Sequence, residues 1–152
     1  MSKARCSISA DDRRYPLRPI LGVGAIIIED GRVLLVERGK EPLRGWWSLP
    51  GGVLETGERL RDGVCREVLE ETGLVVEPVE VVEIFERIMQ DGEGRVEYHY
   101  VLIDYLCRVT GGALCAADDV CNAAWIPRSE LVGYRITEGS LQVIEKTFDV
   151  AG

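Results

Sequence analysis

The stretch that decides the fold runs from Gly52 to Leu74 and reads GVLETGERLRDGVCREVLEETGL. Its pattern predicts a helix from about Glu58 to Thr72, because Thr56 can cap the start and Gly73 can end it. Apolar side chains that recur every four residues mark the face to be buried, and they are Leu60, Val64 and Val68. The acidic residues of this helix therefore lie on another face.

Three carboxylates share that second face. Glu67, Glu70 and Glu71 stand at positions i, i+3 and i+4, so their side chains are neighbours. Like charges this close repel one another and oppose folding unless cations neutralise them, and oxygen ligands at this density suit Mg²⁺ or Mn²⁺. Taken alone, such a cluster is more often a solvated acidic face. The flanking residues decide between the two interpretations.

The flanking residues follow a defined spacing. Gly52 is followed after five residues by Glu58, and after seven more by Arg66 to Leu74, which reads REVLEETGL. This stretch resembles the Nudix box without a departure, and the preceding WSLPG at 47–51 is similar to the lead-in usual in that family. The resemblance implies an α+β Nudix fold, an α/β/α sandwich around a mixed β-sheet.

The resemblance also implies a metal site. The ligands would be the carboxylates of Glu67, Glu70 and Glu71, and the carbonyl of Gly52 would add a backbone oxygen. Glu58 would be an occasional ligand. The cation would be Mg²⁺, with Mn²⁺ as a substitute.

The catalytic set implied by the resemblance is Glu67, Arg66 and Glu70. Arg66 would hold carboxylates in place through charge-assisted hydrogen bonds, with Glu58 as its partner, rather than touch the substrate. A carboxylate would take the proton of the attacking water. Glu67 is the first choice for this base and Glu97, on a later strand, is the second.

The chain on both sides of the box predicts a sheet and one more helix. Turn residues Asp30 and Gly31 separate two apolar runs that form a hairpin, and a longer hairpin follows the box. The segment Leu49 to Gly52 is expected to interrupt regular structure. The expected strands are 20–29, 33–37, 74–89, 96–109 and 123–126, and the second helix is 138–148. Together they form a single domain over residues 1–152, with the box at 52–74.

The composition excludes several kinds of protein. With 46% apolar and 29% charged residues the chain is globular, and its net charge of -8 opposes binding to a nucleic-acid polymer. No apolar stretch is long enough to span a membrane, and no secretory segment is evident, so we expect a cytoplasmic protein. Five cysteines without a CxxC pair and a single histidine indicate reduced thiols rather than a zinc site.

A small anionic substrate needs local positive charge on a chain this acidic. The sequence does not choose among the arginines that could supply it, which are Arg13, Arg14, Arg18, Arg38, Arg44, Arg87 and Arg95. The adjacent Trp46 and Trp47 are better explained as packing residues than as a stacking surface for a base.

The resemblance predicts magnesium-dependent hydrolysis of a diphosphate linkage in a small-molecule nucleotide, with an ADP-ribose-like compound favoured. The proline that marks many ADP-ribose enzymes is absent, since Pro78 is too close to the box and Pro127 too far. One alternative is a pyrophosphohydrolase of nucleoside triphosphates, including oxidised ones. Another is a nucleotide-sensing Nudix domain without turnover. A second copy could complete the pocket as a homodimer.

Overall fold

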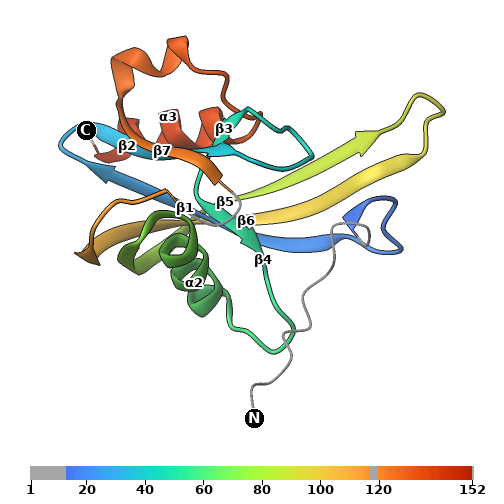
Figure 1. Ribbon diagram of the computed structural model, residues 1–152, viewed down its shortest axis with the longest axis horizontal. Coiled ribbons are helices and arrows are strands. Elements are labelled where there is room, and N and C mark those ends of the chain that lie inside the picture. Colours follow the sequence, from blue (N-terminus) through green and yellow to red (C-terminus); the bar gives the residue numbers. More distant parts are fainter. Residues whose placement is uncertain (1–12, 117–119, 152) are drawn as a thin grey trace.

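The computed structural model describes residues 13–116 and 120–151. Figure 1 labels its elements along the chain. They are β1 (Ile20–Glu29), β2 (Arg32–Arg38), β3 (Trp47–Ser48), β4 (Gly51–Val53), α2 (Leu60–Thr72), β5 (Leu74–Gln90), β6 (Val96–Gly112), β7 (Val120–Pro127), a 3-10 helix (Arg128–Gly133) and α3 (Ser140–Ala151).

Strand β1 joins the two halves of the sheet. Its residues Ile20–Ile27 pair in parallel with Tyr100–Cys107 of β6, and Gly22–Gly24 pair antiparallel with β4 on the other side. The far end of β1 turns through Asp30 into the antiparallel strand β2. The order of the mixed sheet is β3-β2-β1-β6-β5, with β4 beside β1 and β7 beside β2. The central strand therefore carries parallel and antiparallel neighbours at once.

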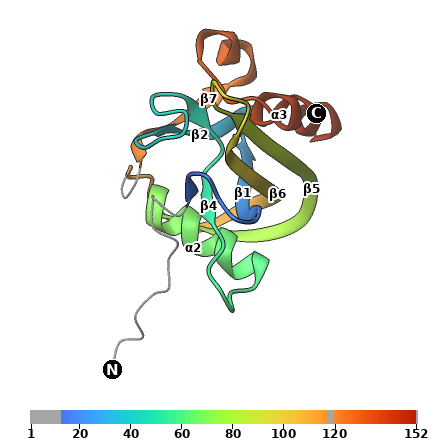
Figure 2. The same cartoon turned by 90° about the vertical axis from the view of Figure 1, so that its right-hand side faces the viewer.

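The two helices cover opposite faces of this sheet (Figure 2). Successive residues of a strand point to opposite faces, so Ala25 packs with Val64 and Val68 of α2, whereas Ile26 packs with Ile144 of α3. The predicted α+β sandwich around a mixed sheet is confirmed. No helix in the part of the chain that the structure describes is long and apolar enough to cross a membrane.

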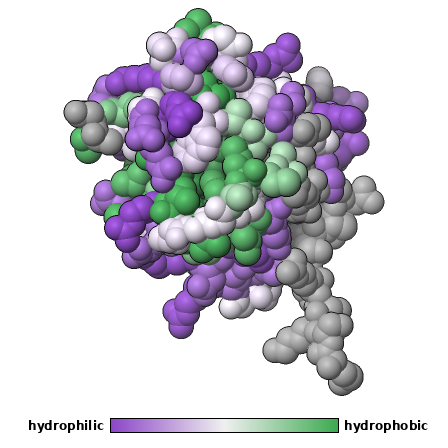
Figure 3. Space-filling model, turned by 60° about the vertical axis from the view of Figure 1, so that its left-hand side comes forward, coloured by the Kyte–Doolittle hydropathy of each residue, from purple (hydrophilic) through white to green (hydrophobic). Residues whose placement is uncertain are grey.

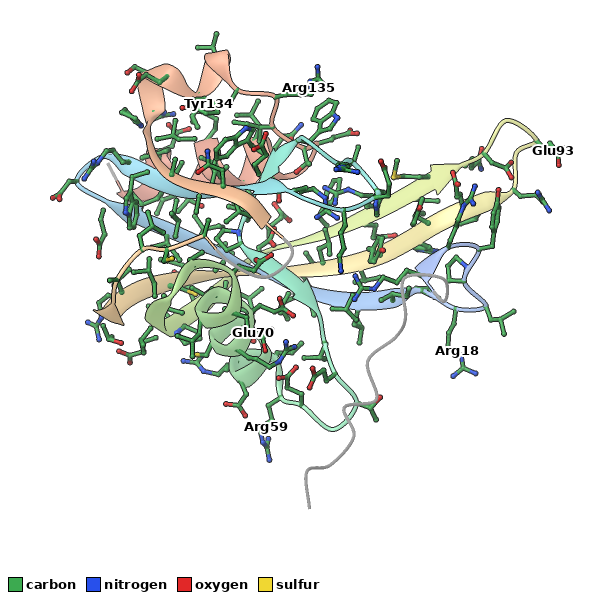
Figure 4. All side chains as sticks on the ribbon, in the orientation of Figure 1. Arg18, Arg59, Glu70, Glu93, Tyr134 and Arg135 are labelled. Atoms are coloured by element: carbon green, nitrogen blue, oxygen red, sulfur yellow. The ribbon has the colours of Figure 1, made fainter. Side chains whose placement is uncertain are left out.

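The hairpin of β5 and β6 extends away from the rest of the molecule, with Glu93 at its tip (Figure 4). Strand β5 forms the edge of the sheet. Its exposed apolar side chains are Val75, Val79, Val81, Ile84 and Ile88. Hydrophobic side chains also gather within a hydrophilic rim on the face drawn in Figure 3. The homodimer stays a prediction, since a single chain does not test it.

The structure corrects three local predictions. Helix α2 begins at Leu60 rather than Glu58, and its N-cap is Arg59, which makes no side-chain capping bond, while Thr56 lies in the preceding turn. Residues 51–53 do not interrupt regular structure, because they form β4 against β1. The last helix begins at Ser140 and continues to Ala151. The predicted end of α2 is confirmed, since Gly73 is left-handed with φ of 76° and its N–H bonds the carbonyl of Leu69.

Candidate active site

Arg66 organises the carboxylates of α2. Its guanidinium donates hydrogen bonds to Glu58 at 2.6 and 2.9 Å, to Glu67 at 2.8 Å and to Glu70 at 3.2 Å. It also donates to the carbonyl of Val53 at 3.2 Å, which ties the helix to β4. Figure 4 shows Glu70 lying against the molecule, whereas Arg59 points out from it. The contact between Arg66 and Glu58 is the one expected from the sequence.

These bonds determine the electrostatics of Arg66. The hydrogen bond to Glu58 raises the pKa of its guanidinium most, burial opposes this, and the bond to Glu67 raises it further. The arginine therefore stays charged at every physiological pH. Among the described residues, this one guanidinium bonds three carboxylates at once.

Strand β4 brings backbone groups to the acidic face. The carboxylate of the buried Glu71 accepts a hydrogen bond from the N–H of Gly51 at 2.7 Å. The carboxylate of Glu67 lies so close to Gly52 that a Cβ at this position would be 2.5 Å from Glu67 Cδ. Only glycine leaves room for that carboxylate beside the backbone.

A cavity opens beside this face, with Glu67, Glu71 and Gly52 in one wall. Four cations from segments far apart in the sequence also line it, and they are Arg13, Arg38, Lys40 and Arg87. The fold thereby selects the arginines that the sequence could not. Of the predicted candidates, Arg14 and Arg95 instead contact Glu97 and Asp91 in the region of the β5–β6 hairpin.

Arg38 and Arg87 lie in the cavity without a carboxylate partner among the described residues. Arg38 donates to the carbonyl of Pro42 at 2.8 Å, and Arg87 donates to the carbonyl of Glu138 at 3.0 Å. Burial lowers the pKa of both guanidiniums, and Arg38 lowers that of Arg87 further. Two half-buried like charges that face a cavity form a binding place for an anion.

The structure adds Asp104, which the sequence did not single out as a site residue. Its side chain is only 6% exposed and lines the cavity from β6. Burial raises its pKa to about 6, Arg87 lowers it and Glu83 raises it. The available signal was the alternation of Tyr100, Leu102 and Asp104 on one face of a strand that is otherwise largely apolar.

The structure does not bring Glu97 into the site. Its carboxylate bonds Arg14 at 2.7 Å, and it does not line the cavity described here. This position favours Glu67 over Glu97 as the base, and the choice between them stays a prediction. Trp46 and Trp47 pack against protein side chains, as expected. The guanidinium carbon of Arg135 lies 5.3 Å from the centroid of the Trp46 ring, and the ring centroids of Trp47 and Tyr134 are 5.2 Å apart.

The chemistry of the acidic face fits a hard divalent cation. The available donors are carboxylate and carbonyl oxygens, and Gly52 leaves space for one carboxylate beside its backbone. Among the residues that the structure describes, no three acidic, histidine or cysteine side chains are already arranged around one point as a metal site. Arg66 and the Gly51 N–H occupy part of the carboxylate oxygens instead. A cation would compete for these oxygens.

A helix with an acidic face lies beside a mixed sheet, and the cavity next to it has arginines without a carboxylate partner in the described chain. Such a site suits a phosphorylated small molecule. Comparison with known proteins gives the family. Residues 18–146 match the NUDIX domain. An ADP-ribose pyrophosphatase of Methanocaldococcus jannaschii is 34% identical over 118 residues, which cover 78% of this chain and 68% of that protein.

Two further relatives agree with this match. An 8-oxo-dGDP phosphatase of Mus musculus is 36% identical over 107 residues, covering 68% of this chain and 30% of the mouse protein. The solved structure of a NUDIX hydrolase from Nitrosomonas europaea has a TM-score of 0.74 at 25% identity, with 88% of this chain and 90% of that chain covered. The chain belongs to the Nudix hydrolase superfamily and is a pyrophosphohydrolase.

Proposed function

We propose that this hydrolase splits the diphosphate linkage of a nucleoside diphosphate derivative, with an ADP-ribose-like compound as substrate and Mg²⁺ as cofactor. One observation carries the proposal: the same cavity is lined by the box carboxylates Glu67 and Glu71 and by Arg38 and Arg87, which have no carboxylate partner among the described residues. A diphosphate bound in this cavity would lie among both groups.

The residues that would hold the cation are Gly52 through its carbonyl, and Glu67, Glu70, Glu71 and Glu58 through their carboxylates. Family members typically use a divalent metal. Bound there, it would neutralise phosphate charge and make a water molecule more acidic. The positive charge of the cation would offset the negative charge of the carboxylates in the cavity wall.

The protein's own residues would do the rest. Glu67, beside Gly52, would accept a proton from the attacking water. Arg66 would keep Glu67 and Glu70 oriented, since it bonds both. Arg38 and Arg87 would bind phosphate oxygens and offset the repulsion from an acidic chain. Glu67, Arg66 and Glu70 thus form the proposed catalytic set, in which Arg66 is a positioning residue.

The choice of substrate rests on the relatives. The methanococcal protein is an ADP-ribose pyrophosphatase, and its match covers 78% of this chain. The mouse relative, an 8-oxo-dGDP phosphatase, supports oxidised nucleotides as a second candidate. A sensor without turnover is disfavoured, since all three box carboxylates are present. We treat the chain as one domain that binds a small nucleotide rather than a nucleic-acid polymer.

The experiment is release of phosphorylated products from ADP-ribose, 8-oxo-dGDP, nucleoside triphosphates, NADH and diadenosine polyphosphates, with Mg²⁺, with Mn²⁺ and with chelator. We expect metal-dependent turnover of ADP-ribose that Glu70→Gln abolishes. The matched control is Glu77→Gln, which removes a surface carboxylate paired with Arg108 and should leave turnover unchanged. Preferred turnover of 8-oxo-dGDP would select the second candidate, and metal-dependent binding without turnover would indicate a sensor.

A further inference from the structure

Asp104 is a buried carboxyl group in the cavity lining. It lies on β6, level with Gly24 of β1 and Glu83 of β5, and is 6% exposed. A Cβ at Gly24 would overlap Asp104 Oδ1, so the absence of a side chain there makes room for the carboxyl. On the same face of β6, Leu102 and Tyr100 continue the lining. Among the lining residues that β1 and β6 supply in the described chain, Asp104 is thus the only acidic one.

The carboxyl of Asp104 has no hydrogen-bond partner among residues 13–116 and 120–151. No hydrogen bond or ion pair to it occurs in the residues that the structure describes, and its electrostatic neighbours are Arg87 and Glu83. Burial raises its pKa to about 6, so the group is mainly ionised at neutral pH. Buried polar groups nearly always have hydrogen-bond partners, because leaving one unsatisfied is costly. Since Asp104 lines the cavity, a donor on the cavity side, from water or from a bound molecule, can satisfy it.

The surroundings limit what this partner can be. An ionised carboxylate only accepts hydrogen bonds, and it repels a phosphate. The diphosphate is better placed near Arg38 and Arg87, whose charges have no carboxylate partner in the described chain. A neutral N–H or O–H group of a bound molecule satisfies Asp104 without that repulsion.

We propose that Asp104 is a specificity residue that accepts a hydrogen bond from a neutral donor on the base or the sugar of the bound nucleotide. The proposal rests on the proposed function in that the cavity must bind a nucleotide. It does not depend on which diphosphate is cleaved. A pocket group with no alternative partner rejects a ligand that lacks the matching donor, and we expect a difference in affinity of about 100-fold for a hydrogen bond to a charged group.

The test measures binding of monophosphates by calorimetry in the presence of Mg²⁺. Each pair of ligands differs by one donor: AMP and purine riboside monophosphate, GMP and IMP, AMP and 2′-deoxy-AMP, AMP and 3′-deoxy-AMP, and ribose 5-phosphate and 2-deoxyribose 5-phosphate. None contains a diphosphate, so the result is independent of hydrolysis. Failure of the proposed function would appear in the product assay and not here.

The variants are Asp104→Leu, which keeps a side chain of similar size but has no hydrogen-bond acceptor, with Asp104→Ala as a second replacement if the first fails to fold. The control is Glu83→Gln, which changes the neighbouring carboxylate on β5, a group paired with Lys146 at 3.5 Å. We expect the unaltered protein to prefer the donor-bearing member of one pair by about 100-fold, and the Asp104 variants to reduce this preference to about threefold. The control should retain it.

The affected pair identifies the source of the donor as a base edge or a sugar. Unchanged preferences in the Asp104 variants would overturn the proposal. So would equal weakening of both members of every pair, which indicates that an ordered water satisfies Asp104. A loss of turnover with no loss of binding preference would assign Asp104 to proton transfer instead.

Discussion

The acidic face of α2 and the carboxyl of Asp104 both contribute to the same cavity, yet they differ in their contacts within the protein. On α2, Arg66 bonds Glu58, Glu67 and Glu70 at 2.6–3.2 Å, so these acids have an internal cation. Asp104 has no bonded partner in the described chain. We infer from this difference that the internal counter-ion orients acids for a metal, whereas the acid without one serves a bound ligand.

The substitution with the largest expected effect on turnover is Glu67→Gln. It keeps the shape of the side chain but removes the proposed proton acceptor, so turnover should fall by about 10²–10⁴-fold. Product release at saturating Mg²⁺ measures the loss, and thermal unfolding checks that the fold is retained. Near-normal turnover would remove Glu67 from the role of base.

Two glycine substitutions test the same two regions, because each adds a Cβ where a carboxylate lies against the backbone. Gly52→Ala should push Glu67 aside and lower turnover by about 100-fold, because small displacements of reacting groups are costly. Gly24→Ala should displace Asp104 and mainly weaken nucleotide binding. Both are measured as kcat and KM.

The control for these substitutions is Gly92→Ala, where a Cβ meets nothing within 4 Å. It should leave both constants unchanged. Equal effects of Gly52→Ala and Gly24→Ala on kcat would show that the two carboxylates do not have separate tasks.

The pH dependence of the free energy of unfolding tests whether the ionised carboxylate of Asp104 destabilises the folded state. Its pKa rises from 3.8 to about 6 on folding, so the folded state binds more protons between these values. The carboxyl therefore imposes no penalty below pH 3.8, a growing penalty as pH rises, and the full penalty above pH 6. Asp104→Asn should raise the free energy of unfolding by about 2 kcal/mol at pH 7.5 and leave it unchanged near pH 3.5. Urea unfolding at several pH values measures this, and a pH-independent difference would contradict it.

The smallest effect is expected at the rim of the α2 cluster. Glu55 is 3.8 Å from Arg66, farther than the other acids, and its side chain is 27% exposed. Glu55→Gln should change the free energy of unfolding by less than about 0.5 kcal/mol, since exposed ion pairs contribute little. A change of several kcal/mol would mean that Arg66 depends on every neighbouring acid.

Local periodicity explains what could be predicted from the sequence. Helix α2 and its acidic face follow from side-chain spacing within a few turns, and Gly73 ends the helix as expected. Its start was missed because Glu58 is held by Arg66 through two hydrogen bonds and stays outside the helix. A side-chain contact eight residues away outweighs local capping preference.

The rest of the cavity depends on the pairing of distant strands. Arg38 and Arg87 reach it from β2 and β5, and Asp104 reaches it from β6. Which of them face the same side depends on the register between strands, and one step of register would turn each side chain to the other face. For this reason, the sequence alone does not show which of the candidate arginines line the cavity.

The parallel pairing of β1 with β6 also has a consequence for how the chain acquires its structure. Ile20 is paired with Tyr100, so the hydrogen bonds of β1 can be completed only after most of the polypeptide has been synthesised. Contacts between segments so distant in sequence form slowly, because a long loop must close first. Helix α2 can form early, but during synthesis on the ribosome it has no finished sheet on which to dock. The binding cavity therefore arises late, in the same event that closes the hydrophobic core.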